Sequence, residues 1–113
     1  MSAVTPLHAR AAKPARIALL GTGTVGSAAW ARLVRWEGTP LGERLSLVHV
    51  ANSRFAISNR DGVPADTREL LLRNAPRPSS LELVETSLAG DGTRIVIDAT
   101  ASDDVADWHA RWL

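Results

Sequence analysis

The chain has 113 residues, of which 45% are hydrophobic and 22% charged, with 13 basic and 12 acidic residues and no cysteine. This composition is typical of one globular domain, and it excludes a disulfide framework, a thiolate nucleophile and a cysteine metal site. The nearly neutral charge argues against a nucleic-acid partner, and no apolar run reaches the roughly 20 residues that cross a bilayer. We therefore expect a cytoplasmic α/β domain that binds neither nucleic acid nor membrane.

Residues 1–15 are expected to form a flexible leader, because Pro6 and Pro14 interrupt a stretch that has no hydrophobic periodicity. The domain itself is expected to span residues 16–113. A transit peptide is a weaker interpretation, since the leader lacks acidic residues but is short and poor in serine.

A glycine-rich turn follows the first expected strand. Residues Ile17 to Leu20 are apolar, as in a strand covered on both faces, and Gly21, Gly23 and Gly26 follow with the G-x-G-x-x-G spacing of dinucleotide-binding folds. In such a turn the first glycine permits the sharp bend, the second lets the backbone approach a pyrophosphate, and the third lets a helix pack closely on the sheet. A nucleoside-triphosphate loop fits less well, because Ser27 stands where that motif requires lysine.

The next helix is predicted over Thr24 to Trp36, with an inner face made of Val25, Ala29, Leu33 and Trp36. Its first amide groups would hold phosphates with the help of the helix dipole. The pattern therefore predicts NAD or NADP as the cofactor.

Residues Leu45 to Ala51 are predicted to be the second buried strand, and the exit of that strand bears on cofactor choice. Folds that bind NAD usually place an acidic residue here, against the ribose 2′-hydroxyl. This chain has Asn52 and Ser53, which can hydrogen-bond a ribose, and Arg54, which can pair with a 2′-phosphate. NADP is thus permitted, although Arg54 as a solvated loop cation is an equal alternative.

The stretch from Phe55 to Arg77 carries the weakest pattern, with a short helix predicted over Asp66 to Asn74. A further helix is predicted between a Ser79 or Ser80 cap and Gly90.

Residues Arg94 to Ala99 are predicted to be the third buried strand, followed by a helix from Asp103 to Leu113 with Ser102 as its cap. With the strands ordered second, first, third, Thr100 and Ala101 fall where the carboxyl ends of the first and third strands meet, which is the crevice that holds a dinucleotide. Asp98 is expected to make structural hydrogen bonds rather than to act as a base. The three histidines have no metal-binding spacing, so no metal site is predicted.

From Arg16 to Leu113 the chain resembles the amino-terminal nucleotide-binding domain of homoserine dehydrogenase. The resemblance is carried by Gly21-Thr-Gly-Thr-Val-Gly26, by Val50-Ala-Asn-Ser-Arg54, and by Val96-Ile-Asp-Ala-Thr-Ala-Ser102 with the Val105-Ala-Asp107 that follows. It implies a Rossmann-type parallel sheet with flanking helices that binds NAD or NADP. It also implies hydride transfer that interconverts L-aspartate 4-semialdehyde and L-homoserine, in the biosynthesis of threonine and methionine.

In the family that the chain resembles, an Asn-Lys pair, the catalytic Lys and Asp, the substrate pocket and the dimer-forming region follow the last helix. The chain is therefore expected to be truncated, to contain no catalytic residue, and to meet the small-molecule substrate only in a full-length, homo-oligomeric enzyme. The third strand is then expected to have an unpaired edge, with Trp108 and Trp112 exposed. A non-enzymatic NAD(P)-sensing or interaction module is the alternative. The predicted cofactor-binding residues are Gly21, Gly23, Thr24, Val25, Gly26, Asn52, Arg54, Thr100 and Ala101.

Overall fold

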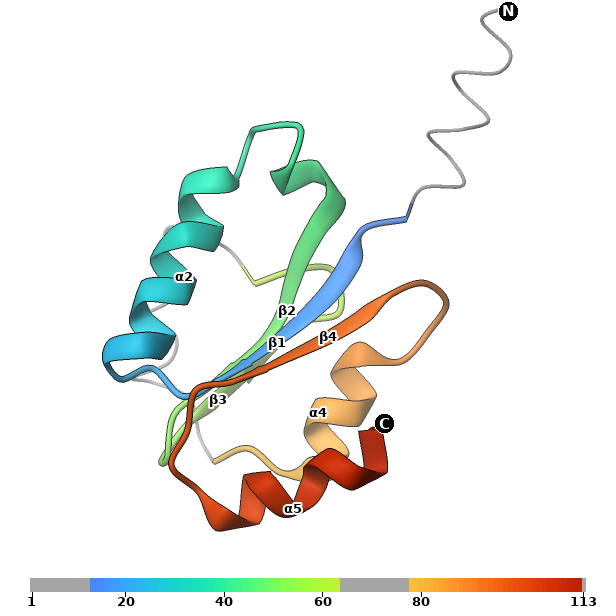
Figure 1. The fold of residues 1–113 in the computed structure, drawn as a ribbon. Coiled ribbons are helices and arrows are strands. Elements are labelled where there is room, and N and C mark those ends of the chain that lie inside the picture. Colours follow the sequence, from blue (N-terminus) through green and yellow to red (C-terminus); the bar gives the residue numbers. More distant parts are fainter. Residues whose placement is uncertain (1–12, 64–77, 113) are drawn as a thin grey trace, which may run out of the picture.

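The computed structural model describes residues 13–63 and 78–112, which form a four-stranded sheet with helices on both faces (Figure 1). The predicted helix over Asp66 to Asn74 and most of the predicted leader lie outside the described residues. The strands are ordered β3-β2-β1-β4, so the predicted order of the three main strands is confirmed. They are β1 (Ala15–Leu20), β2 (Leu45–Ala51), β3 (Ala56–Ser58) and β4 (Arg94–Asp98).

The sheet is mixed, which corrects the prediction of a purely parallel one. Strand β1 runs parallel to both β2 and β4, whereas β3 runs antiparallel to β2. A tight turn after β2 reverses the chain: the N–H of Asn52 donates to the carbonyl of Phe55 at 2.9 Å. The side-chain oxygen of Asn52 also accepts hydrogen bonds from the backbone N–H groups of Arg54 and Phe55. A side-chain acceptor of this kind closes a turn without help from the rest of the fold.

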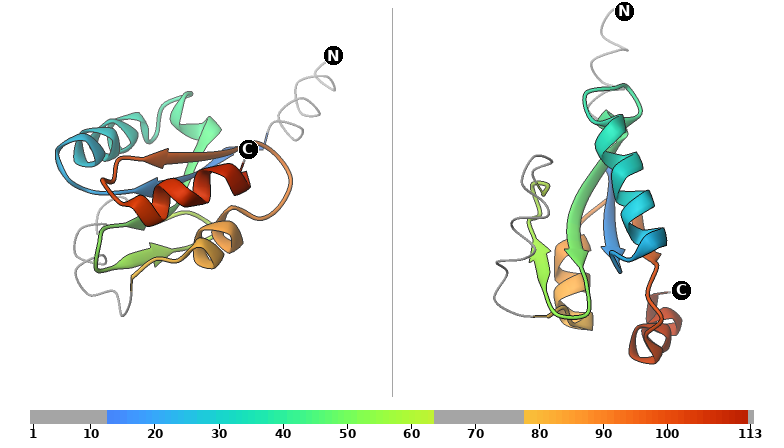
Figure 2. Two further views of the ribbon diagram at one scale, coloured as in Figure 1. Left: turned by 60° about the horizontal axis from the view of Figure 1, so that its bottom comes forward. Right: turned by 90° about the vertical axis from the view of Figure 1, so that its left-hand side faces the viewer.

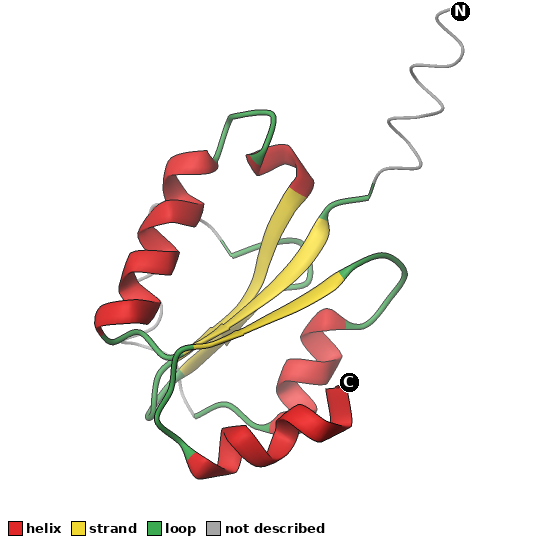
Figure 3. Cartoon of the chain, viewed as in Figure 1, coloured by secondary structure: helices red, strands yellow, loops and turns green. Residues whose placement is uncertain are grey.

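The helices form two layers around the sheet (Figure 2; coloured by element type in Figure 3). Helix α2 covers one face, and α4 and α5 cover the other (Figure 1). None of the helices in the described ranges is long and apolar enough to cross a membrane. The helices are α2 (Thr24–Trp36), the short 3-10 helix η1 (Gly42–Arg44), α4 (Leu81–Leu88) and α5 (Asp103–Trp112).

Alternation along the strands divides the core between the two faces. Ile17 and Leu19 of β1 pack under α2, and Ala18 and Leu20 pack toward α4 and α5. These four side chains are at most 3% exposed, so β1 is the centre of the hydrophobic core.

The predicted inner face of α2 is confirmed at three of its four residues: Leu33 is buried, and Ala29 and Trp36 pack against the core. Val25, the fourth, is 70% exposed, and Gly26 and Trp30 are buried in addition.

The predicted exposure of the two α5 tryptophans is wrong. Trp108 and Trp112 of α5 are half-buried against the core instead of exposed, with their ring centroids 6.0 Å apart in an edge-to-face arrangement.

Strand β4 lies at the edge of the sheet and, within the described residues, pairs with β1 alone. Its apolar residues stay partly exposed, in contrast to those of β1 and β2. The carbonyl of Thr93 and the N–H of Ala99 form hydrogen bonds with β1. Because backbone groups alternate in direction along a strand, the N–H and C=O groups of residues 94, 96 and 98 point away from β1. Such outward donors and acceptors are a template for another strand.

We predict that the 113-residue chain self-associates through this edge, measured as a concentration-dependent mass in analytical ultracentrifugation. A Val96→Pro variant should shift the equilibrium toward monomer, because it removes an outward N–H and no bond to β1. The control is Ile97→Pro. The backbone N–H of Ile97 points toward β1 in the same alternation, so proline there removes a hydrogen bond between β4 and β1, and this variant should unfold. A wild-type chain that stays monomeric at all concentrations would contradict the prediction.

Candidate functional site

A cavity of about 770 Å³ lies at the carboxyl ends of β1, β2 and β4. Four segments that are distant in sequence form its wall: the glycine turn, the exit of β2, the segment before α4, and the β4–α5 turn. The carboxyl ends of parallel strands are where α/β sheets bind ligands. The lining residues are Leu20, Gly21, Thr22, Gly23, Ala51, Asn52, Ser53, Pro78, Ser79, Ala99, Thr100, Ala101, Ser102, Asp104, Val105 and Trp108.

Two of the three glycines are required by the packing of the protein itself. Gly21 has φ = +96°, and a Cβ there would lie 2.6 Å from the carbonyl oxygen of Ala99. A Cβ on Gly26 would lie 1.8 Å from the carbonyl oxygen of Gly21. Real Cβ atoms do not approach backbone this closely, so neither position tolerates a side chain without a backbone shift.

Gly23 differs from these two glycines. A Cβ built there meets no atom of the described residues within 4 Å, yet the residue lines the cavity. Gly23 is also the N-cap of α2, in an extended conformation that any residue adopts. Its lack of a side chain therefore has no explanation in the protein's own packing.

The amino end of α2 carries no compensating negative group. Gly23 gives no side-chain cap, and the first turn contains no acidic residue. By contrast, α4 is capped by Ser80 and has Glu82 in its first turn. In α5, the hydroxyl of Ser102 accepts from the N–H of Val105, and two acidic residues follow it. Only α2 among these three helices thus presents free amide groups and an uncompensated positive dipole end, which attracts anions.

The predicted site residues divide into two groups. Gly21, Gly23, Asn52, Thr100 and Ala101 line the cavity. The other four predicted residues, which do not line it, are Thr24, Val25, Gly26 and Arg54.

The second group still bears on the site in different ways. Gly26 is buried against Gly21, so it shapes the turn rather than touching the cavity. Arg54 is exposed beside the cavity-lining Ser53. The side-chain oxygen of Asn52 is engaged by the turn, so its amide nitrogen is the group that can donate toward a ligand.

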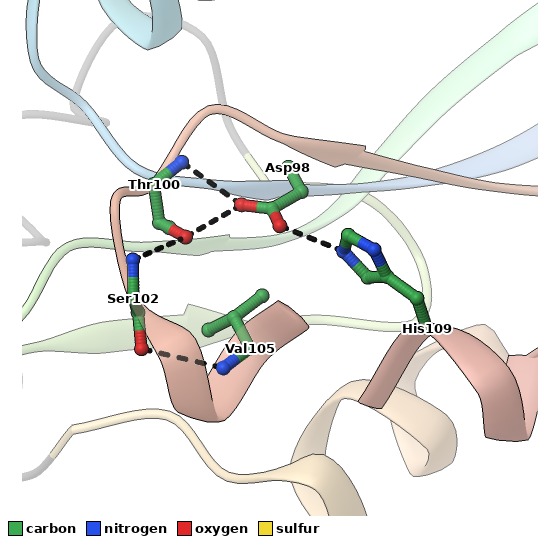
Figure 4. A network of polar contacts seen from close by, with 5 residues as sticks. All are labelled: Asp98, Thr100, Ser102, Val105 and His109. Carbon is green, nitrogen blue, oxygen red and sulfur yellow. Dashed lines mark hydrogen bonds and ion pairs between the residues drawn. The ribbon is translucent and has the colours of Figure 1, made fainter. Parts of the chain in front are cut away.

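Asp98, at the end of β4, is the centre of a polar network behind the cavity wall (Figure 4). One carboxylate oxygen accepts from the N–H of Thr100 at 2.9 Å and from its hydroxyl at 2.6 Å; the other lies 2.7 Å from Nε2 of His109. Burial raises the pKa of Asp98, but the hydrogen bonds from Thr100 and the charge of His109 outweigh it and hold the pKa below its ordinary value. The carboxylate is therefore ionised and holds the β4–α5 turn, which agrees with the structural role predicted for it.

Among the cavity residues that sequence reasoning did not place at the site are Pro78, Ser79, Asp104 and Trp108. The sequence indicates Ser79 only as a candidate helix cap, and Ser80 fills that role. Asp104 and Trp108 belong to α5, which follows the predicted crevice residues Thr100 and Ala101. Whether they reach the cavity depends on the direction in which α5 leaves the sheet, which the sequence does not show. Among the described residues no group of His, Asp and Glu side chains is arranged to hold a metal ion.

No family model, curated protein or solved structure matches the chain.

His49 of β2 is fully buried and joins the sheet to the cavity wall. Its Nδ1 lies 2.7 Å from the hydroxyl of Ser58 on β3, and its Nε2 lies 2.8 Å from the hydroxyl of Ser79. The hydroxyl of Ser87 on α4 lies 3.5 Å from Nδ1. Burial lowers the pKa of His49 from 6.5 to about 4, so the ring is neutral at physiological pH.

We predict that His49 makes the fold sensitive to mild acid. Its pKa is lower in the folded than in the unfolded chain, so the unfolded chain binds more protons and stability is lost as pH falls below about 6.5. Between pH 7 and pH 5 this group should lower the free energy of unfolding by about 2 kcal/mol. Urea denaturation at both pH values measures it, with His49→Gln as a non-titrating comparison. An equal pH dependence in the two proteins would contradict the prediction.

Proposed function

We propose that the chain binds NAD or NADP as the nucleotide-binding portion of homoserine dehydrogenase, through a Rossmann-type fold. The observation that supports this best is the position of Gly23, which opens on the cavity at the uncapped end of α2. A backbone free of side chains at the positive end of a helix suits a pyrophosphate, whose charges need several donors and a close approach.

The lining residues fit a dinucleotide in chemistry and in extent. The cavity volume of about 770 Å³ falls within the usual range for small-molecule sites. Gly21 to Gly23 would hold the pyrophosphate, Asn52 and Ser53 the adenosine ribose, and Thr100 and Ala101 the nicotinamide half. When bound, the cofactor supplies hydride transfer at its nicotinamide ring, and the residues of this chain bind and orient it.

The proposed reaction is the interconversion of L-aspartate 4-semialdehyde and L-homoserine. It is supported by the three sequence stretches that resemble the family, all of which border the cavity. An NAD(P)-sensing module would use the same cavity, so the activity of a full-length protein on these two substrates, and not cofactor binding by this chain, separates the two functions.

The first prediction from this proposal is that Gly23→Val abolishes binding of NADPH while the chain still unfolds in one cooperative thermal transition. The new side chain meets no described atom within 4 Å, so the fold tolerates it, but it fills the proposed pyrophosphate position. NADPH fluorescence titration measures the affinity. Ala28→Val, which introduces the same side chain at an exposed position of α2 outside the cavity, is the matched control. Equal affinity of the Gly23→Val and wild-type chains would refute the pyrophosphate site.

The second prediction concerns the 2′-phosphate. Arg54→Ala should weaken NADPH binding by roughly tenfold and leave NADH binding unchanged, because a charge-assisted hydrogen bond to the phosphate is lost. Isothermal titration with both cofactors gives the ratio of affinities. Arg35→Ala removes an exposed cation from the opposite end of α2 and controls for net charge. If the ratio does not change, Arg54 is a solvated loop cation.

A further inference from the structure

The cavity has an apolar wall as well as the polar one at the glycine turn. Leu20, Ala51 and Val105 line it and belong to the core cluster between the sheet and helices α4 and α5, and Trp108 of α5 packs against that cluster. This wall therefore lies on the α4 and α5 face of the sheet, opposite the face that α2 covers (Figure 1). An apolar surface that includes an indole ring suits a flat aromatic ring rather than a phosphate.

The adenine of a dinucleotide bound as proposed lies next to this wall. The chain continues from Ala51 at the end of β2 directly to Asn52 and Ser53, which would hold the adenosine ribose. Because the base is bonded directly to that ribose, it falls against the apolar wall that begins at Ala51. On this face the segment before α4 contributes a hydroxyl group to the cavity, that of Ser79.

The protons of the buried His49 network decide what Ser79 presents to a ligand. Burial lowers the pKa of His49 to about 4, so the neutral ring carries one N–H. Two hydroxyl oxygens lie near Nδ1, that of Ser58 at 2.7 Å and that of Ser87 at 3.5 Å. The Ser87 hydroxyl donates its proton to the carbonyl of Leu83 at 2.7 Å, so its oxygen can only accept from the ring. The N–H is therefore at Nδ1, and the bare Nε2 accepts the proton of the Ser79 hydroxyl at 2.8 Å.

A ligand in the cavity consequently meets Ser79 as a hydrogen-bond acceptor, because the single proton of its hydroxyl is committed to His49. We propose that Ser79 is a specificity-determining residue of the cofactor site, and that its hydroxyl oxygen accepts a hydrogen bond from the 6-amino group of adenine. This inference rests on the proposed function. A 6-oxo purine presents a carbonyl oxygen at the same place, where two acceptors face each other and no hydrogen bond forms.

The suitable probes are NADH and its hypoxanthine analogue, deamino-NADH. The two differ only in the purine, so the pyrophosphate, both riboses and the nicotinamide make the same contacts. Loss of one hydrogen bond between neutral groups weakens binding by roughly three- to tenfold. The wild-type chain should therefore bind NADH more tightly than deamino-NADH by this factor.

The test is a titration of both compounds, followed by dihydronicotinamide fluorescence, with wild type, Ser79→Ala, Ser79→Cys and Ser53→Ala. Ser79→Ala removes the acceptor, so it should bind the two compounds equally. Ser79→Cys keeps a weak donor for Nε2 of His49, but sulfur is a poor acceptor, so this variant should also lose most of the discrimination. Ser53→Ala removes the same atom from another cavity serine and is the matched control. It should weaken both compounds alike and keep the preference for NADH.

Three results overturn the inference, and they can be told apart. Equal affinity of the wild-type chain for NADH and deamino-NADH shows that the 6-amino group is not recognised, and leaves cofactor binding intact. A preference for NADH that persists in Ser79→Ala and Ser79→Cys shows that another residue recognises it. Absence of binding of both compounds to the folded wild-type chain refutes the proposed function together with this inference. Thermal melts verify that every variant is folded, and Ser79→Cys carries the test if Ser79→Ala unfolds.

Discussion

The structure depends on one close contact between three backbone segments. They are the turn at Gly21, the first turn of α2 at Gly26, and the turn after β4 at Ala99. A side chain on Gly21 would overlap the carbonyl of Ala99, and one on Gly26 would overlap the carbonyl of Gly21. This three-way approach sets where β1 ends, in which direction α2 leaves, and how near the β4–α5 turn lies. The cavity is bounded by those same segments, so the packing that fixes the fold also fixes the site.

Charge is distributed unevenly around this contact. The amino ends of α4 and α5 are capped by serine hydroxyls and followed by acidic residues, as expected for helices that must satisfy their own amide groups. The amino end of α2 has neither feature, and it alone of the three faces the cavity through a glycine that packing does not require. A local departure from good helix capping is a common mark of a functional site, because the unmet groups are kept for a ligand.

Local patterns were enough to predict the elements that form the cavity. Helix α2 and strand β2 begin and end at the predicted residues, because glycine turns and a long apolar run mark them. Strand β3 was missed because it is three residues long and exists through its pairing with β2. The hydrophobic period places Ala29, Leu33 and Trp36 of α2 correctly on the core side, but it fails for Val25 in the first turn, where Gly26 packs against Gly21. The contact of Ser79 with His49 joins residues 30 positions apart, which no local pattern encodes.

The central claim is that a dinucleotide lies across the carboxyl ends of the three main strands. Titration of isotope-labelled protein with NADP⁺, followed by amide chemical shifts, tests this claim residue by residue. The account predicts saturable changes at Gly21 to Gly26, at Asn52 and Ser53, and at Thr100 to Ser102, with little change along the outer face of α4. Saturating changes elsewhere, or none at the glycine turn at millimolar cofactor, would contradict it.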